Sequence, residues 1–293
     1  MRTKRAPGVQ IKTPAQLAFM HAAGQVVAAA LRAAADAVAP GVSTADLDAI
    51  AAARIGAAGA IPSFPGYHGF PATICASIND EIVHGIPSAS RVLRDGDVVS
   101  IDCGASVAGW HADAALTVPV GAVPAELAKL IGDCERACWQ GLAAARAGAR
   151  LSDISCAVER SVRAAGEYGI VEDYVGHGIG SEMHMDPPVP NHGRPGRGPV
   201  LAEGMALAIE PLLVLGSPDT RLLDDGWTVV SEDGGWSAHF EHTVAITAEG
   251  PWVLTASTGP PPGALAGSPA GVLAGGQVIV RAAAPARQPH PAG

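Results

Sequence analysis

Residues 95–118 read DGDVVSIDCGASVAGWHADAALTV and hold two stretches of β-forming residues, each associated with an aspartate. The first stretch, Asp97–Cys103, contains the apolar run VVSID, which ends on Asp102. The second stretch, Ala114–Val120, follows directly after Asp113. β-Branched residues bounded by glycine, proline or aspartate are typical of strands. The segment therefore predicts two strands that carry carboxylates into apolar surroundings, where a charge is costly unless it is paired or metal-bound.

Helices are expected on both sides of this segment. Thr13, Pro14 and Gln16 form a capping-box pattern for a helix that continues to Ala39 and stops at Pro40-Gly41. The further helices expected are one capped by Ser43 or Thr44 and ending near Gly56 to Gly59, one from Pro124 to about Ala147, and one capped by Ser152 and ending at Ala165. The further strands expected are Thr73–Asn79, Met205–Leu215, Trp227–Ser231, Phe240–Thr247 and Trp252–Thr255. The order helix–helix–strands occurs twice, which predicts an α+β domain of two similar halves with the active cleft between them.

Composition excludes several classes of protein. The 293 residues carry 19 Lys+Arg against 28 Asp+Glu, a net charge of −9, which argues against a general nucleic-acid binder. The longest apolar run, Val26–Ala39, is interrupted by Arg32 and Asp36, so we expect no membrane span, and the basic N-terminus lacks the apolar core of a signal peptide. Five cysteines without a CxxC pair indicate reduced thiols. We therefore expect a cytoplasmic protein.

The C-terminal segment differs from the rest of the chain. From Ala256 onward it is rich in proline, glycine and alanine and nearly uncharged. We expect residues 1–255 to form the catalytic domain and residues 256–293 to form a disordered tail. The alternative is that Gly276–Ala282 adds one edge strand.

Five titratable residues lie within apolar or glycine-rich strand sequence: Asp102, Asp113, His177, Glu210 and Glu241. Singly, each is as consistent with a turn cap or a buried polar group as with a functional residue. Together they are a ligand set dominated by oxygen, with one imidazole, and such a set suits Mn, Fe(II), Co or Zn. Four carboxylates can supply bridging and terminal ligands to two ions. The residues therefore predict a dinuclear hydrolase, although spacing alone does not establish that they converge.

Six ordered motifs resemble those of the type I methionine aminopeptidases in their short bacterial form. They are YHGFPATICASINDEIVHGIP (67–87), DGDVVSIDCG (95–104), GWHADAALTV (109–118), VGHGIGSEMH (175–184), GMALAIEP (204–211) and DGWTVVSEDGGWSAHFEHTVAIT (225–247). The resemblance implies the pita-bread fold, with two pseudo-symmetric halves and a central antiparallel sheet around a dinuclear metal site. It also implies removal of the initiator methionine when the second residue is small.

The resemblance assigns roles residue by residue. Asp102 corresponds to a terminal ligand, Asp113 and Glu241 to bridging ligands, and His177 and Glu210 to ligands of the second ion. Glu210 also corresponds to the general base for the nucleophilic water. His84 corresponds to a histidine near the scissile bond, and His184 to one that stabilises the oxyanion. The residues that resemble the substrate side-chain pocket are Tyr67, Phe70, Cys75, Met183 and Trp227. Phe70 replaces a tyrosine and Met183 an aromatic residue of some relatives, so we expect altered affinity with the same specificity.

Two alternatives stay open. One is another pita-bread hydrolase, an Xaa-Pro aminopeptidase or prolidase, which keeps the same ligand types. The other is a catalytically inactive pita-bread protein that binds the ribosome or RNA. Five further histidines match no catalytic position: His68, His111, His192, His239 and His242.

The resemblance also implies cofactors and partners. We expect two divalent ions per chain, drawn from Co, Mn, Fe(II) or Zn. The expected substrates are N-terminal Met peptides and nascent chains, with transient ribosome contact, no sequence-specific nucleic-acid binding and a monomeric state.

Overall fold

A computed structural model describes residues 8–256 of the chain. Its helices are α1 (Pro14–Ala37), α2 (Thr44–Ala57), α3 (Ala125–Ala144) and α4 (Leu151–Ala165), with a 3-10 turn η1 (Tyr67–Gly69). Its strands are β1 (Ile61–Pro62), β2 (Ile74–Ile78), β3 (Glu81–Val83), β4 (Val98–Val107), β5 (Trp110–Pro119), β6 (Gly169–Ile170), β7 (Gly176–Gly178), β8 (Met185–Val189), β9 (Ala206–Ile209), β10 (Leu212–Val214), β11 (Thr220–Leu222), β12 (Val229–Ser231), β13 (Ser237–His239), β14 (Glu241–Thr247) and β15 (Gly250–Val253).

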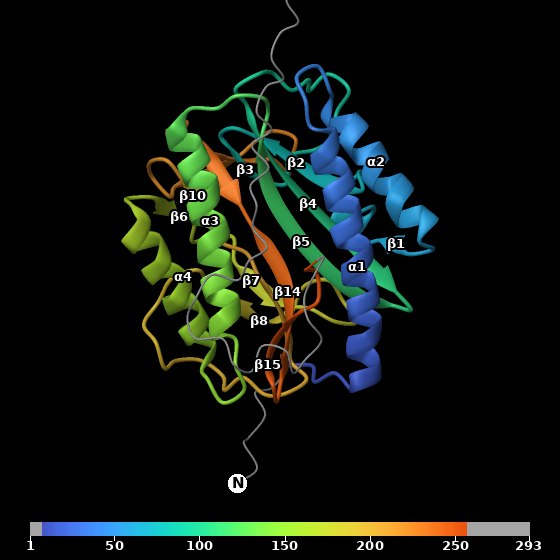
Figure 1. The fold of residues 1–293 in the computed structure, drawn as a ribbon, viewed down its shortest axis with the longest axis vertical. Helices are drawn as coiled ribbons and strands as arrows, with labels where there is room; N and C mark the ends of the chain where they lie inside the picture. Colours follow the sequence, from blue (N-terminus) through green and yellow to red (C-terminus); the bar gives the residue numbers. More distant parts are fainter. Residues whose placement is uncertain (1–7, 257–293) are drawn as a thin grey trace, which may run out of the picture.

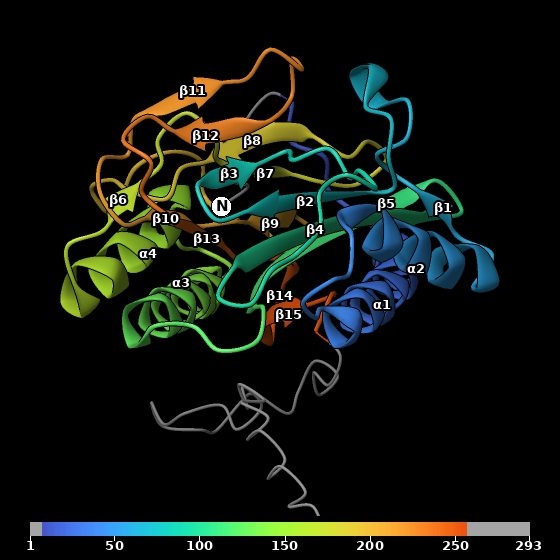
Figure 2. The ribbon, with the colours of Figure 1, turned by 90° about the horizontal axis from the view of Figure 1, so that it is seen from above.

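The main sheet is antiparallel and runs in the order β1-β4-β5-β14-β9-β7-β8. Strand β2 adds to β4, and β15 forms a hairpin with β14. The four helices cover one face of this sheet, while β3, β11 and β12 lie over the other (Figures 1 and 2). Among the described residues, the face away from the helices is therefore covered by strands and loops and by no α-helix.

The helices divide the core into two parts. Helices α1 and α2 pack on one end of the sheet, where Leu31, Leu47 and Ile101 are buried together. Helices α3 and α4 pack on the other end, where Leu142 and Val158 belong to a second cluster. Two helix pairs on one curved sheet confirm the expected α+β architecture with two helix–helix–strand halves (Figure 1).

The first two helices begin where the sequence predicts. Thr13 Oγ1 accepts the backbone N–H of Gln16, and Gln16 Oε1 accepts that of Thr13, which completes the capping box. Helix α4, however, begins at Leu151, so the predicted cap at Ser152 is wrong. The Ser152 hydroxyl instead accepts the backbone N–H of Arg197 and donates to its carbonyl, so it fixes a distant loop.

Some expected strands are divided or shortened. The stretch 205–215 forms β9 and β10, separated at Pro211, because proline has no N–H to continue a ladder. Strand β12 begins at Val229, two residues later than expected. Asp225 Oδ1 accepts the N–H groups of Trp227 and Thr228, which makes that segment a turn. The short strands β1, β3, β6, β7, β8, β11 and β13 were not predicted, since they span two to five residues with no extended alternation.

Helix α1 is long and apolar enough to cross a membrane, by length and composition only. In the fold it is a core helix. Met20, Val27 and Ala34 are fully buried, and the helix packs against β4 and β5. Its apolar character is therefore explained by burial against the sheet. The expected tail and the alternative strand at Gly276–Ala282 lie outside the described residues.

Candidate metal centre

Five neighbouring strands bring the predicted ligands together, one from each. Asp102 lies on β4, Asp113 on β5, Glu241 on β14 and His177 on β7, and Glu210 directly follows β9. We call these five residues the carboxylate cluster.

The register places their side chains on one face of the sheet. Ala115 pairs with Asp102 on one side and Glu241 on the other, and Asp113 precedes it by two residues. Ala208 likewise pairs with His177, and Glu210 follows it by two. Because side chains alternate between the faces of a strand, all five point the same way. This is the face that the helices leave uncovered, since Ile101 and Cys103 of β4 point into the helix-side core.

The polar atoms of the cluster are close enough to share a cation. Asp113, His177 and Glu241 each offer a ligand atom, and these atoms all lie within 4.8 Å of one another. His177 Nε2 lies 3.6 Å from Glu210 Oε1 and 4.0 Å from Glu241 Oε1. Asp113 and Glu241 are only 3% and 2% exposed. The structure therefore brings together residues that are up to 139 positions apart in the chain (241 − 102 = 139).

Burial and mutual repulsion disturb the ionisation of this cluster. Burial raises the pKa of Asp113 to about 7. Burial, together with the neighbouring carboxylates, raises the pKa of Asp102, Glu210 and Glu241 well above the usual range. Burial lowers the pKa of His177 to about 3, so its imidazole is neutral. Bound cations would stabilise the ionised form of these four acids, and a neutral imidazole is the form that coordinates a metal.

Unpaired polar atoms support the same interpretation. Six buried side-chain polar atoms lack a hydrogen-bond partner among residues 8–256. Three of these belong to the cluster: Asp102 Oδ1, Asp113 Oδ1 and Glu241 Oε1. Buried oxygens without donors are costly, and a bound cation would satisfy these three. Oxygen ligands with one imidazole fit a hydrolytic divalent metal.

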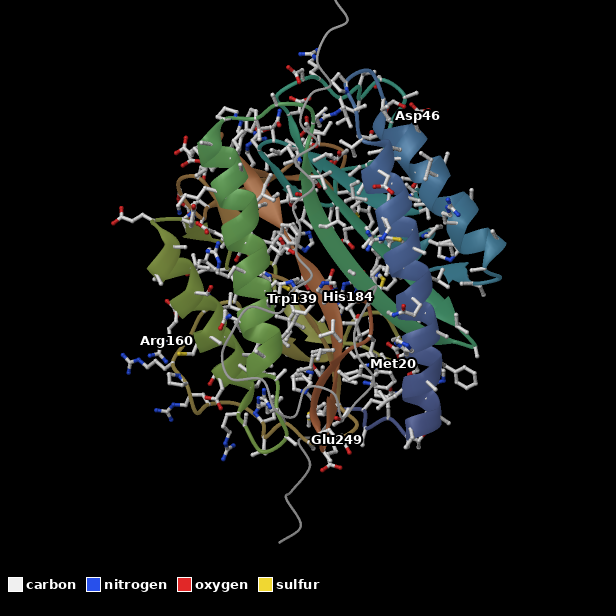
Figure 3. All side chains as sticks on the ribbon, in the orientation of Figure 1. Met20, Asp46, Trp139, Arg160, His184 and Glu249 are labelled. Atoms are coloured by element: carbon white, nitrogen blue, oxygen red, sulfur yellow. The ribbon has the colours of Figure 1, made fainter. Side chains whose placement is uncertain are left out.

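Two histidines border the cluster. His184 lies just before β8, and its ring centroid is 4.2 Å from that of His177. Both rings line a surface hollow that also includes Gly176 and Asp186. The position of His184 in the fold is labelled in Figure 3. His84 follows β3 and lies against Trp227, with ring centroids 6.1 Å apart. Burial lowers the pKa of His84 to about 4 and also lowers the pKa of His184, so both are neutral donors near pH 7.

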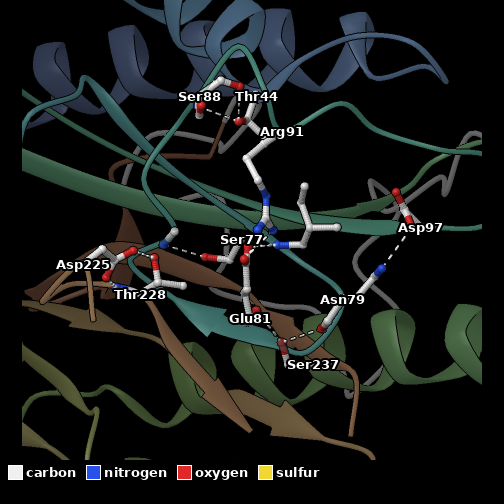
Figure 4. A network of polar contacts seen from close by, with 12 residues as sticks. Thr44, Ser77, Asn79, Glu81, Ser88, Arg91, Asp97, Asp225, Thr228 and Ser237 are labelled. Carbon is white, nitrogen blue, oxygen red and sulfur yellow. Dashed lines mark hydrogen bonds and ion pairs between the residues drawn. The ribbon is translucent and has the colours of Figure 1, made fainter. Parts of the chain in front are cut away.

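A polar network surrounds Glu81 on β3, the strand that ends just before His84 (Figure 4). Glu81 accepts the N–H of Ile78 at 2.8 Å and pairs with Arg91. Gly85 donates its N–H to Ser77 Oγ at 3.0 Å. A Cβ at position 85 would lie 2.5 Å from the carbonyl oxygen of Ala76, so only glycine fits there. His84 itself has φ +62°, a rare conformation for a non-glycine residue, and this network maintains it.

An apolar cluster lies beside the carboxylate cluster. Phe64, Phe70, Cys75 and Met183 are buried together, with Tyr67, Ala72, Ile86 and Trp227 packed against them. All five predicted pocket residues belong to this group. Cys75 pairs in register with Asp102, and burial, together with the carboxylates Asp102, Asp113 and Glu241, raises the pKa of its thiol. Cys75 therefore marks the junction between the two clusters.

Two further residues, His239 and Phe64, lie at the site and were not predicted from the sequence. His239, which matched no catalytic position, is 1% exposed and places Nε2 3.9 Å from Glu210 Oε2. That Nε2 is another of the unpaired buried atoms. Its position two residues before Glu241 was the available signal, because alternation along an extended strand would place both on one face. Phe64 was likewise absent from the predicted pocket.

A curled antiparallel sheet, backed by two helix pairs and carrying buried carboxylates and imidazoles on its open face, defines a metallohydrolase of the pita-bread class. Comparison with known proteins agrees. The profile described as "Metallopeptidase family M24" matches residues 18–248. The chain is similar to methionine aminopeptidase 1 of Mycobacterium tuberculosis, at 54% identity over 83% of this chain and 94% of the relative. It is also similar to methionine aminopeptidase 1 of Bacillus subtilis, at 48% identity over 83% of this chain and 98% of the relative.

Solved structures show the same relationship. A methionine aminopeptidase from Thermotoga maritima superposes with a TM-score of 0.83 at 39% identity, covering 84% of this chain and 99% of that one. A prolidase from Pyrococcus furiosus shares the fold, with a TM-score of 0.68 at 22% identity over 85% of this chain and 66% of that one. The chain belongs to metallopeptidase family M24 and, within it, to the methionine aminopeptidases.

Proposed function

We propose that this chain is a metal-dependent aminopeptidase that removes N-terminal methionine from proteins and peptides whose second residue is small. One observation carries the proposal: the carboxylate cluster and the apolar cluster meet at Cys75. A substrate that buries an apolar side chain against Phe70 and Met183 would therefore place its α-amine and first peptide bond beside the carboxylates. This geometry limits cleavage to the first residue.

The five residues of the carboxylate cluster would hold two divalent ions, with Asp113 and Glu241 shared between them. Bound there, such ions would lower the pKa of a water and polarise the scissile carbonyl. The donor set is compatible with Co, Mn, Fe(II) or Zn. The unpaired oxygens of Asp102, Asp113 and Glu241 support this assignment.

Glu210 is the proposed general base. Its side chain is 13% exposed, so it reaches solvent at the edge of the cluster, unlike Asp113 and Glu241. Burial and Asp113 raise the pKa of its carboxyl group, and bound cations would favour the ionised form, which is the form that accepts a proton. It would take the proton of the attacking water and return it to the leaving amine.

His84 and His184 are the proposed hydrogen-bond donors to the substrate. Both are neutral near pH 7, so each presents an N–H without introducing a positive charge among the cations. His184, whose ring is tilted against that of His177, would stabilise the oxyanion of the tetrahedral intermediate. His84, held by the network around Glu81, would contact the substrate near the scissile bond.

The proposal extends to the setting in which the enzyme acts. Initiator methionines are exposed on chains as they leave the ribosome, so we place the protein in the cytoplasm, as a monomer in transient contact with ribosomes. Residues 1–255 would suffice for this activity.

Peptide hydrolysis by metal-stripped protein, with Mn or Co restored or withheld, tests the proposal. The peptides are Met-Ala-Ser, Met-Lys-Ser and Ala-Pro-Ala. We expect metal-dependent release of methionine from Met-Ala-Ser alone. Cleavage of Ala-Pro-Ala would place the protein with the Xaa-Pro hydrolases. Bound metal without any cleavage would instead support a binding module.

A further inference from the structure

A hydrogen bond joins the apolar cluster to His184. The Tyr67 hydroxyl and His184 Nδ1 are 2.9 Å apart, although the two residues are 117 positions apart in the chain. Their ring centroids lie 5.2 Å apart with planes tilted by 37°. Tyr67 therefore does more than form an apolar wall, because its polar end contacts a histidine that borders the carboxylate cluster.

The chemistry of the pair sets the direction of this bond. A neutral imidazole has one protonated and one bare nitrogen, and in His184 the nitrogen that faces the Tyr67 hydroxyl is Nδ1. Burial and Glu182 raise the pKa of Tyr67, so its hydroxyl keeps its proton. A phenol O–H is a better donor than an imidazole N–H, and a bare imidazole nitrogen is a better acceptor than a phenol oxygen. These properties favour donation from the hydroxyl to Nδ1, an arrangement in which the ring proton is on Nε2.

The backbone around Tyr67 fixes the donor in place. Tyr67 N donates to the Phe64 carbonyl at 2.9 Å, Phe70 N donates to the Tyr67 carbonyl at 2.9 Å, and Gly66 N donates to the Phe70 carbonyl at 2.8 Å. Phe64 and Phe70, which are 6% and 3% exposed, anchor the two ends of this turn. A tyrosine held in this way can orient its partner without a further loss of conformational freedom.

We propose that Tyr67 is a positioning residue that holds His184 in the Nε2–H tautomer and so directs a hydrogen-bond donor at the carbonyl of the scissile bond. The inference rests on the proposed function for its catalytic consequence. The tautomer itself does not depend on that function.

Tyr67→Phe tests the inference, because it removes the hydroxyl and retains the aromatic ring. We expect kcat for Met-Ala-Ser to fall about tenfold, the effect of one hydrogen bond, with KM changed less than about twofold. Tyr168→Phe is the matched control. It also removes a tyrosine hydroxyl from a hydrogen bond, the 2.8 Å contact with Asp133, but in the network between α3 and β6. It should lower thermal stability without lowering kcat.

Nitrogen-15 NMR of the zinc-loaded protein gives a readout that a structural role would not change. The signals of His184, assigned by its absence in His184→Asn, should report the Nε2–H tautomer in the wild type and a mixture of tautomers in Tyr67→Phe. An Nδ1–H tautomer in the wild type would overturn the inference, and so would an unchanged kcat in Tyr67→Phe. Failure of the wild type to release methionine would count against the proposed function, while the tautomer measurement would still decide the role of Tyr67.

Discussion

The carboxylate cluster and the apolar cluster adjoin each other, yet they are built from different elements. The proposed ligands come from the long, paired strands β4, β5 and β14 and from β7 and the end of β9. The apolar cluster comes mostly from short or irregular segments: η1, the turn before β12 and the loop before β8. Cys75 on β2 is the shared member, paired with Asp102 in the sheet.

This difference indicates how each region tolerates change. Several strands fix each ligand, and the removal of one leaves buried charges without compensation. The apolar cluster depends on volume and shape, which a similar side chain can restore. Substitutions in the first region should therefore affect the chemistry, and those in the second should affect affinity, except at Tyr67, whose hydroxyl contacts His184.

Glu210→Gln should have the largest effect. It removes a ligand charge and the general base, so we expect kcat to fall about 10³-fold or more, since general bases contribute about 10²–10⁴-fold. The assay is Met release from Met-Ala-Ser with saturating Mn. Glu203→Gln, at an exposed carboxylate on the same approach to β9, should be neutral. Turnover within tenfold of wild type would exclude Glu210 as the base.

His84→Ala should separate binding of metal from chemistry. Loss of one oriented donor costs about 10²–10³-fold in kcat, whereas the affinity for Mn, measured by titration calorimetry, should stay within about twofold. His192→Ala is a control, because that histidine lies 3.8 Å from Glu172 and outside both clusters. A loss of metal affinity in His84→Ala would make His84 a ligand instead.

Metal affinity should depend on pH because the carboxyl groups hold protons in the metal-free protein. The pKa of Asp113 is raised to about 7, and a metal must displace that proton below this pH. We expect the affinity for Mn to rise about tenfold per pH unit between pH 5 and 7 for each proton displaced, and to level off above the raised pKa values.

The same shifts predict a change in stability. Acids with a raised pKa in the folded state bind more protons folded than unfolded, so their stabilising contribution is lost as pH rises from about 4 through 7. Melting temperatures measured with and without Mn isolate the contribution of these acids, because buried neutral histidines such as His242 contribute equally to the Mn-free and the Mn-bound protein. A gain in melting temperature on adding Mn that is independent of pH would contradict the raised pKa values.

Met183→Leu, in the apolar cluster, should have a small effect. The residue is 4% exposed, and leucine has a similar volume, so we expect kcat to be unchanged and KM to shift about threefold or less. The preference for Met-Ala-Ser over Leu-Ala-Ser should stay the same. A large fall in kcat would show that the two clusters are not separable.

Removal of residues 257–293 should have the smallest effect. All five residues of the carboxylate cluster and the whole apolar cluster lie before Ala256. We expect kcat and KM to match those of the full chain. A tenfold loss would assign the tail a part in catalysis and overturn the boundary proposed at residue 255.

The sequence by itself determined the helices, the long strands and the identity of the clustered residues. Capping at Thr13 and Ser43 is a local signal, and so are alternating strands that carry Asp102 or Glu241, because each depends on residues only a few positions apart. Motif order indicated the family for the same reason, since a motif is a local pattern.

Tertiary structure alone decided which side chains meet. Strand register placed the five proposed ligands on one face, and no local pattern specifies the pairing of Ala115 with Glu241. The fold also brought His239 beside Glu210 and joined Tyr67 to His184. The contact between Tyr67 and His184 depends on the packing of segments 117 residues apart. The sequence could therefore predict the residues and the class of reaction, but only the folded sheet determined the geometry of the site.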